Sequence, residues 1–228
     1  MKKTKVTIVV PTYNEEKNID KIQKSLDSLK GDFEVFFSDG FSKDKTFEKI
    51  YYPKIRKTKY RSRQMNRGAD LAKTDYIWFV HADSVLHEDS VLAIEDSGLE
   101  AGCFKVRFGK ASLLMKMEEF FSNIRVPMRN LAFGDQGIFI KRELFEEIGG
   151  YKDMPIMEDY QLSLDLSKRG IKFGQLDLPI YTSPVRFEKN GIIKQVIKMQ
   201  VLQKRFRDGE DIWKIYEAVS YTHLRAHE

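Results

Sequence analysis

Residues 6–16 read V-T-I-V-V-P-T-Y-N-E-E, and this stretch decides our expectation for the fold. Apolar, mostly β-branched residues fill positions 6–10, which predicts a short buried strand that ends at Pro11. Asn14 is of a type that caps helices, and the two glutamates after it suit the positive end of a helix. Apolar residues then recur at helical spacing, at Ile19, Ile22, Leu26 and Leu29. The stretch therefore predicts a strand, a polar loop and a helix, in that order.

The same alternation continues through the first half of the chain. Patterns there predict strands at 33–37 and 76–80 and helices near 44–50 and 63–72. Strands that alternate with helices in this way are typical of a parallel α/β sheet. The second half is less regular: we expect strands at 103–108 and 137–140, and helices at 111–123, 142–148, 158–169 and 191–207.

Composition narrows the class of protein. The chain has 228 residues, of which 42% are apolar, with 16 Phe and 10 Tyr, so it can bury a core and is not disordered. Its single cysteine, Cys103, excludes a disulfide framework and a zinc site made of several cysteines. No uncharged run approaches the roughly 18 residues of a membrane-spanning helix. The basic start is followed by too short an apolar stretch for a signal peptide. We therefore expect a cytoplasmic protein.

Positive charge is concentrated in one segment. The net charge is +5, but residues 51–67 hold seven basic residues and no acidic one, so the rest is slightly acidic. A surface that coats nucleic acid would be basic more evenly, and we expect no nucleic-acid partner. The segment favours one local anion site, although a solvated basic loop remains the alternative.

We find neither an internal repeat nor a low-complexity linker, so the chain is expected to form one domain. That domain covers residues 1–219. Residues 220–228, S-Y-T-H-L-R-A-H-E, resemble a translated vector scar or a disordered tail and are left out of the functional argument.

Polar groups follow three predicted strands, where an open α/β sheet binds its ligands. They are the loop 11–15, Asp39 with Asp44, and His81-Ala82-Asp83. Carboxylates there can accept from a ribose hydroxyl or hold a hard cation that bridges phosphates. One such residue is ordinary turn chemistry, but three in order predict a nucleotide site. Neither G-x-G-x-x-G nor G-x-x-x-x-G-K-[ST] occurs, which argues against a nicotinamide dehydrogenase and a P-loop enzyme.

Several motifs together resemble the family 2 glycosyltransferases of GT-A fold, and in particular a small bacterial branch. P-T-Y-N-E-E at 11–16 is followed about 25 residues on by D-G-F-S at 39–42, where most members lack the inserted Phe41. Further motifs occur in the same order: R-x-x-Q-M-N-x-G from Arg61, H-A-D at 81–83, G-D-Q-G-I-F at 134–139, E-I-G-G-Y at 147–151, M-E-D-x-x-L at 157–162 and S-P-V-R-F at 183–187. The resemblance implies a Rossmann-like, mostly parallel sheet flanked by helices, with a less regular C-terminal half.

The resemblance also implies roles for individual residues. Asp83 would bind Mg²⁺ or Mn²⁺, and His81 is either a further ligand or a structural residue. Asp159 would be the base of an inverting sugar transfer, whereas the other interpretation of Glu158-Asp159 is stabilisation of a first helical turn. The donor would be a nucleotide sugar, with a UDP-sugar favoured, and the acceptor is unknown. The nucleotide sugar would be held by Pro11, Tyr13, Glu15, Asp39, Arg61, Gln64, Asn66 and Arg186.

Two other functions stay open at this point. A nucleotidyltransferase-like enzyme could share the sheet, although such enzymes carry a glycine-rich loop after the first strand and residues 11–16 contain no glycine. The chain could also be a non-catalytic module that binds a nucleotide or a partner. We expect the helix at 191–207 to pack on the core with a wet basic face. The alternative is peripheral contact with the inner face of a membrane through Lys194, Lys198, Lys204, Arg205 and Arg207.

Overall fold

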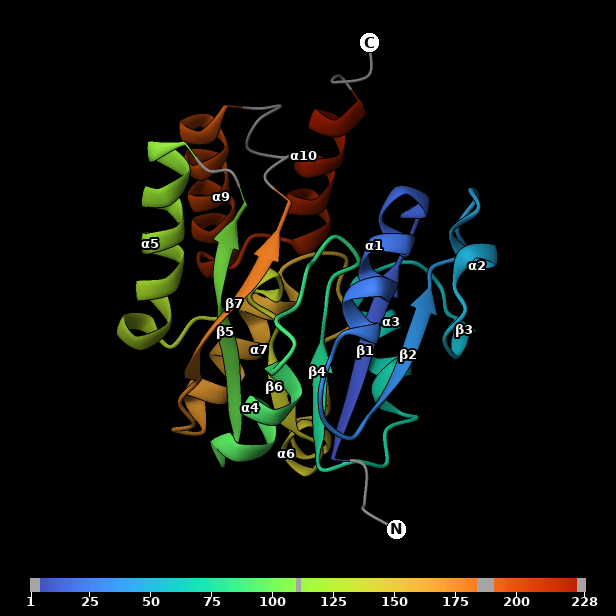
Figure 1. Ribbon diagram of the computed structural model, residues 1–228. Helices are drawn as coiled ribbons and strands as arrows, with labels where there is room; N and C mark the ends of the chain where they lie inside the picture. Colours follow the sequence, from blue (N-terminus) through green and yellow to red (C-terminus); the bar gives the residue numbers. More distant parts are fainter. Residues whose placement is uncertain (1–4, 110–111, 184–190, 225–228) are drawn as a thin grey trace.

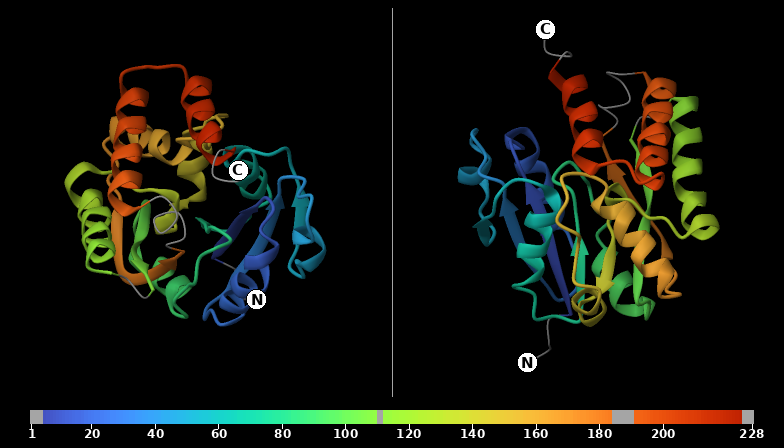
Figure 2. Two further views of the ribbon diagram at one scale, coloured as in Figure 1. Left: turned by 90° about the horizontal axis from the view of Figure 1, so that it is seen from above. Right: turned by 180° about the vertical axis from the view of Figure 1, so that it is seen from behind.

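The computed structural model describes residues 5–109, 112–183 and 191–224, with side chains to residue 219 (Figure 1). One sheet runs through the molecule, and helices lie on both of its faces (Figure 2). The strands are β1 (Val6–Thr12), β2 (Phe33–Asp39), β3 (Lys54–Arg56), β4 (Tyr76–Phe79), β5 (Ala101–Phe108), β6 (Phe139–Lys141) and β7 (Gly174–Thr182). The helices are α1 (Glu16–Asp27), α2 (Thr46–Lys49), α3 (Arg61–Ala69), α4 (Ser90–Ser97), α5 (Leu113–Arg129), the 3₁₀ helix η1 (Gly134–Gln136), α6 (Arg142–Glu147), α7 (Glu158–Lys168), α9 (Ile192–Arg207) and α10 (Ile212–Leu224).

The sheet has the order β3-β2-β1-β4-β6-β5-β7. Strand β6 is antiparallel to both of its neighbours, while the other strand pairs are parallel. The expected mostly parallel α/β sheet is confirmed. Because parallel strands share a direction, their carboxyl ends meet at one edge of the sheet, and the polar loops after β1, β2 and β4 come together there.

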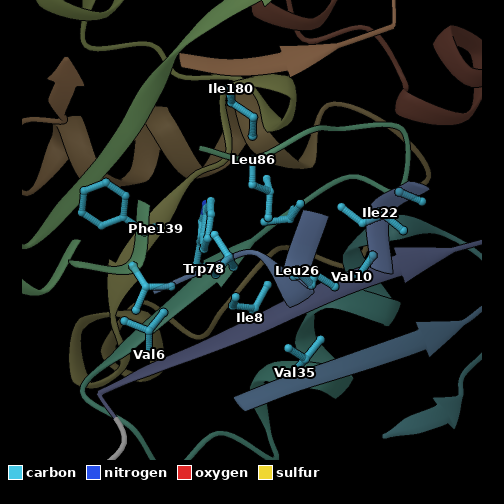
Figure 3. Close-up of a cluster of buried hydrophobic side chains, with 14 of the residues drawn as sticks. Val6, Ile8, Val10, Ile22, Leu26, Val35, Trp78, Leu86, Phe139 and Ile180 are labelled. Carbon is cyan, nitrogen blue, oxygen red and sulfur yellow. The ribbon is translucent and has the colours of Figure 1, made fainter. Parts of the chain in front are cut away.

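Strand β1 lies inside the sheet, and its side chains are buried on both faces. Ile8 and Val10 belong to a core cluster that also contains Leu26 of α1 and Trp78 of β4 (Figure 3). Val9 points to the opposite face, where a second cluster includes residues of α3, α6 and α7. Burial on both faces explains why this strand is a continuous apolar run rather than an alternating one.

Helix α3 lies very close to β1, because Gly68 has no side chain. A Cβ atom built on Gly68 would lie 2.3 Å from Val9 Cγ1. No side chain fits into that space unless the helix moves away from the strand. The glycine therefore fixes the distance between α3 and the sheet.

Several local expectations about the first half need correction. Asn14 does not cap α1: it has a positive φ of 54°, and its Oδ1 accepts a hydrogen bond from the Lys43 backbone across the loop. Strand β1 also continues beyond Pro11, to Thr12. The patterns missed the helix α4. They also missed β3, because a three-residue edge strand within the basic segment carries no apolar periodicity.

Helix α5 departs most from expectation. It continues through Pro127 to Arg129, beyond the predicted end at residue 123. The large apolar side chains of this amphipathic helix face solvent, while the buried positions are Met115, Glu119, Ser122 and Val126. The exposed set is Leu113, Leu114, Met117, Phe120, Phe121, Ile124 and Met128.

The reversed orientation of α5 follows from an edge of β5. Strand β5 pairs with β6 only at Ala101 and Gly102, so its later backbone groups on that side need other partners. Asn123 accepts from Val106 N at 2.9 Å and donates to Val106 O at 3.1 Å, and Glu119 accepts from Phe108 N at 2.6 Å. The polar side of α5 thus replaces part of a β ladder, and its apolar side is left outward.

The prediction that the helix at 191–207 packs on the core through its apolar side is largely wrong. Leu202 is buried, but Ile193, Ile197 and Val201 of α9 are at least half exposed. Helix α10 follows and runs to Leu224, so residues 220–224 of the expected tail continue a helix. In the part of the chain that the structure describes, no helix combines the length and apolar character needed to cross a membrane.

Candidate active site

A cavity of about 150 Å³ lies at the carboxyl ends of β1 and β4. Three segments of the chain supply its wall: the loop after β1, the first turns of α3, and the loop after β4. Six residues predicted from the sequence to bind the nucleotide sugar or the metal are brought together here. The lining residues are Pro11, Thr12, Tyr13, Glu15, Arg61, Gln64, His81, Ala82 and Asp83.

Arg61 connects this cavity to the start of α7. Its Nε lies 2.8 Å from Oε1 of Glu158, which is only 2% exposed, and its NH1 lies 3.2 Å from Nε2 of His81. The charge of Glu158 raises the pKa of Arg61, so the guanidinium stays charged. Burial raises the pKa of Glu158, and Arg61 counteracts that rise. The ion pair therefore places one fixed positive charge at the cavity wall.

Asp159 is oriented by two backbone N–H groups. Gly134 N donates to its Oδ2 at 2.9 Å, and Tyr160 N donates to its Oδ1 at 2.7 Å. Gly134 also lies against the cavity wall, because a Cβ atom on it would be 2.6 Å from His81 Nε2 and 3.5 Å from Asp159 Oδ2. Gly134 therefore contacts both the Asp159 carboxylate and His81 of the cavity wall. Each oxygen keeps lone-pair capacity for a further hydrogen bond.

Asp39 and Gln64 hold the ends of β1 and β2 together. Asp39 is fully buried and accepts hydrogen bonds from Ser42 N at 2.9 Å and from Thr12 Oγ1 at 3.3 Å. Gln64 Nε2 donates to Thr12 O at 2.6 Å and to Ser38 O at 2.9 Å. Gln64 still lines the cavity, whereas Asp39 is not among the lining residues.

Asn66 has contacts that the sequence did not indicate. Its Nδ2 donates to Tyr151 O at 2.8 Å, and its Oδ1 accepts from Tyr151 N at 2.9 Å. These bonds hold the turn that precedes α7 and leave Asn66 outside the cavity lining. The remaining predicted ligand, Arg186, lies outside the described residues.

The donor set can be compared with the needs of a divalent cation. Asp83 offers one carboxylate at the cavity, and no group of three or more His, Cys, Asp or Glu that could hold a metal occurs within the described ranges. One protein carboxylate plus phosphate oxygens is a common arrangement for Mg²⁺, so Asp83 fits such a role together with a diphosphate. His81 fits less well, because its Nε2 already faces the Arg61 guanidinium.

The basic segment contributes less to the cavity than its charge suggested. Of its seven basic residues, only Arg61 lines the cavity. Arg56 stacks on the Phe47 ring at 4.0 Å, and Arg63 makes a two-pronged pair with Asp153 at 2.6 and 3.0 Å. Of the basic segment that was expected to form an anion site, one arginine therefore reaches the cavity. The contact between Arg61 and Glu158 was missed, since nothing in the sequence links residues so far apart.

Comparison with solved structures supports the same architecture. TarS of S. aureus, residues 1–349 in complex with UDP, matches with a TM-score of 0.61 and 16% identity over 78% of this chain. This chain covers 60% of that TarS fragment, so it spans less than two thirds of its length. A mannosyltransferase from Pyrobaculum calidifontis in complex with GDP-Man and Mn²⁺ matches with a TM-score of 0.62 and 19% identity, over 98% of this chain and 71% of that one. At these identities the likeness establishes the fold.

No protein with a curated description matches the chain significantly. The model of the family described as glycosyl transferase family 2 matches residues 7–149, which is more than half of the chain. The matched range includes the loop after β1, the first turns of α3, the loop after β4 and Gly134. The chain therefore belongs to glycosyl transferase family 2 and has the GT-A fold.

Proposed function

We propose that this protein transfers a sugar from a nucleotide-diphosphate sugar to an acceptor hydroxyl, with inversion at the anomeric carbon. The observation that carries the proposal is the position of Asp159. Its carboxylate is oriented by two N–H groups, and one of them belongs to Gly134, which lies against His81 of the cavity wall. A base so close to the donor cavity can reach an acceptor hydroxyl at the edge of that cavity.

The donor would occupy the cavity at the strand ends. Pro11, Tyr13 and Glu15 would contact the nucleoside, and Arg61 would lie beside the diphosphate, which a guanidinium suits. The structural neighbours were solved with UDP, UDP-GlcNAc and GDP-Man. Uridine and guanosine nucleotides are therefore the first donors to test, and we favour a UDP-sugar.

In the proposed reaction the acceptor hydroxyl gives its proton to Asp159 as its oxygen attacks the anomeric carbon. The bond between that carbon and the diphosphate oxygen breaks, and its electron pair leaves with the nucleoside diphosphate. Asp83 would hold Mg²⁺ or Mn²⁺, which offsets the negative charge of the leaving diphosphate. Arg61 adds a positive charge whose position is fixed by Glu158.

Family membership argues against the two other functions considered from the sequence, a nucleotidyltransferase-like enzyme and a non-catalytic binding module. The cytoplasmic location, the bacterial origin and the single domain over residues 1–219 stay predictions.

The test compares Asp159→Asn with Asp165→Asn, a matched change on the same helix α7. Release of nucleoside diphosphate from a panel of UDP-, GDP-, dTDP- and CDP-sugars is measured with and without Mn²⁺. We expect Asp159→Asn to lower kcat by at least about 100-fold and Asp165→Asn to change it less than about twofold. Full activity of Asp159→Asn would overturn the assignment of the base.

A second measurement separates binding from chemistry. Thermal shift with the nucleotide should keep its amplitude in Asp159→Asn, since that residue is assigned to the acceptor side. Asp83→Asn should instead abolish the Mn²⁺-dependent part of the shift. If no nucleotide shifts the unfolding temperature of the wild-type protein, the donor cavity is assigned wrongly.

A further inference from the structure

Helix α5 exposes a continuous apolar stripe along its length. Leu113 is 76% exposed, Phe120 60% and Met128 72%, and Phe121 is similarly exposed beside Phe120. Large apolar side chains scattered singly on a surface are normal, but a row of them on one helix indicates a surface that contacts something. The donor cavity makes no use of this stripe.

Helix α9 carries a second exposed apolar stripe. Ile193, Ile197 and Val201 follow each other at helical spacing and are at least half exposed. The two helices lie side by side in both views (Figures 1 and 2), and Met115 of α5 and Ile192 of α9 belong to one buried cluster at their first turns. We call the exposed apolar residues of α5 and α9, together with Lys116, Lys194 and Lys198, the α5–α9 face.

Among the described residues, the lysines of this face have no acidic partner. Within the described residues, no salt bridge involves Lys116, Lys194 or Lys198, and α9 contains five basic residues but no acidic one. Burial and the charge of Lys194 lower the pKa of Lys198, as expected where two like charges lie close without an acid between them.

A groove next to the α5 stripe repeats this combination of charge and apolar surface. It has a volume of about 540 Å³ and lies between α5 and the strands β5 and β7. Phe120 and Ile124 line it together with Lys116. Lys105 and Arg107 line it as well, and they form ion pairs with Asp177 and Glu119. Aromatic and aliphatic side chains with ammonium groups beside them match the boundary between acyl chains and negatively charged headgroups.

We propose that the α5–α9 face binds the surface of an anionic lipid membrane. The apolar side chains enter the headgroup boundary, and the three lysines contact lipid phosphates. A second copy of this chain is a poorer occupant, since a symmetric contact through this face would bring the same lysines together. The pattern of charge therefore favours a negatively charged partner over a copy of the protein itself.

The face also starts at the edge of the sheet that carries the donor cavity. Strands β5 and β7 run in the same direction as β1 and β4, and they lead into α5 and α9. Both helices therefore begin at the edge where the carboxyl ends of the strands meet. Binding through this face would bring that edge towards the membrane.

The proposal is tested by co-sedimentation of the full chain with vesicles of phosphatidylcholine alone and vesicles that also contain phosphatidylglycerol. We expect sedimentation with the anionic vesicles only, and less of it at high salt. Phe120→Ser with Phe121→Ser should lower the partition coefficient at least about tenfold. Lys194→Glu with Lys198→Glu should lower it about 25-fold or more, since each lysine near such a surface contributes about fivefold.

The matched control reverses two exposed lysines on α1, Lys21→Glu with Lys24→Glu. This variant has the same net charge as the α9 variant and should bind vesicles like the wild type. Thermal unfolding of each variant shows whether the fold is retained. The proposal is overturned if the wild type does not sediment with anionic vesicles, or if the α1 control loses as much binding as the α9 variant. Self-association in sedimentation velocity that Phe120→Ser with Phe121→Ser abolishes, without vesicle binding, would identify a second copy as the occupant instead.

Discussion

Helices α1 and α5 are both amphipathic, yet they face the sheet with opposite sides. Helix α1 turns Ile19, Ile22 and Leu26 inward and leaves its charged residues in solvent. Helix α5 turns Glu119 and Ser122 inward and exposes its aromatic residues. The difference lies in the strands beneath them: β1 is paired along both edges, whereas β5 is paired with β6 at two residues only.

Unpaired backbone groups can therefore decide which side of a helix faces a sheet. An unsatisfied buried N–H or C=O costs about 1–3 kcal/mol, which is similar to the gain from burying one apolar side chain. Strand β1 pairs with β2 along its whole length and with β4 over Val6–Val9, and apolar burial determines how α1 lies. The later residues of β5 lack a strand partner on the β6 side, and the side chains of α5 that can pair with their backbone groups turn inward.

The largest effect is expected for the apolar side of α1. Replacement of Leu26 by Ala removes methyl groups from a fully buried site and should lower the free energy of unfolding by about 2–5 kcal/mol. Urea denaturation monitored by circular dichroism measures this. A loss below about 1 kcal/mol would mean that α1 does not depend on its apolar side as the comparison requires.

A smaller loss is expected when the polar side of α5 is altered. Asn123→Leu keeps the size of the side chain but leaves Val106 N and O without their partners, so the free energy of unfolding should fall by about 1–3 kcal/mol. Lys116→Ala on the exposed side of the same helix is the control. Equal stability of Asn123→Leu and the wild type in urea would refute the role of β5 in orienting α5.

The N-terminus of α1 should depend on pH in a way that the N-terminus of α5 does not. Burial raises the pKa of Asp44, but hydrogen bonds from the Thr46 hydroxyl and from Thr46 N and Glu16 N outweigh it and lower the pKa below 3.8. The ionised group therefore stabilises the fold fully above its ordinary pKa, and this contribution is lost as the pH falls through the lowered value. Asp44→Asn should cost about 1 kcal/mol at neutral pH.

Unfolding free energies measured from neutral pH to pH about 2 check this expectation. The gap between wild type and Asp44→Asn should narrow on acidification and close once Asp44 is protonated in the folded state. A gap that stays constant over this range would contradict the assignment. Helix α5 offers the contrast, because Ser112 Oγ accepts from Met115 N at its start and does not titrate in this range.

The smallest effect is expected on the exposed side of α5. Phe120→Ala should change the free energy of unfolding by less than about 0.5 kcal/mol, because the side chain already faces solvent. The measurement is again urea denaturation. A loss as large as that of Leu26→Ala would show that the aromatic stripe is packed in solution, and the contrast between the two helices would disappear.

The same difference explains how much of the molecule could be predicted. Strands β1, β2 and β4 follow from their apolar runs, and the polar loops after them follow from turn chemistry. Which side of α5 faces the sheet could not be predicted. Periodicity shows that a helix has two sides, but it does not show which backbone groups lie beneath the helix. The same holds for the residues of the cavity. Pro11, Tyr13 and Asp83 could be placed there because they follow predicted strands, whereas the ion pair between Arg61 and Glu158 depends on the tertiary fold.

Asn66 illustrates a further limit of sequence reasoning. It lies in the same motif as Arg61, and the motif predicted a shared role for both. On a helix, residues five positions apart point in different directions. Arg61 therefore reaches the cavity while Asn66 reaches the Tyr151 backbone.

The close contact between Gly68 and Val9 determines where helix α3 lies relative to the cavity. Arg61 lies at the first position of α3, and Gly68 lies about two helical turns further on. The helix connects the two residues rigidly. A methyl group at Gly68 would tilt helix α3 away from β1, and this tilt would displace the Arg61 guanidinium roughly 10 Å away. The position of Arg61, which pairs with Glu158 at the cavity, thus depends on the absence of a side chain at Gly68, a residue that does not line the cavity.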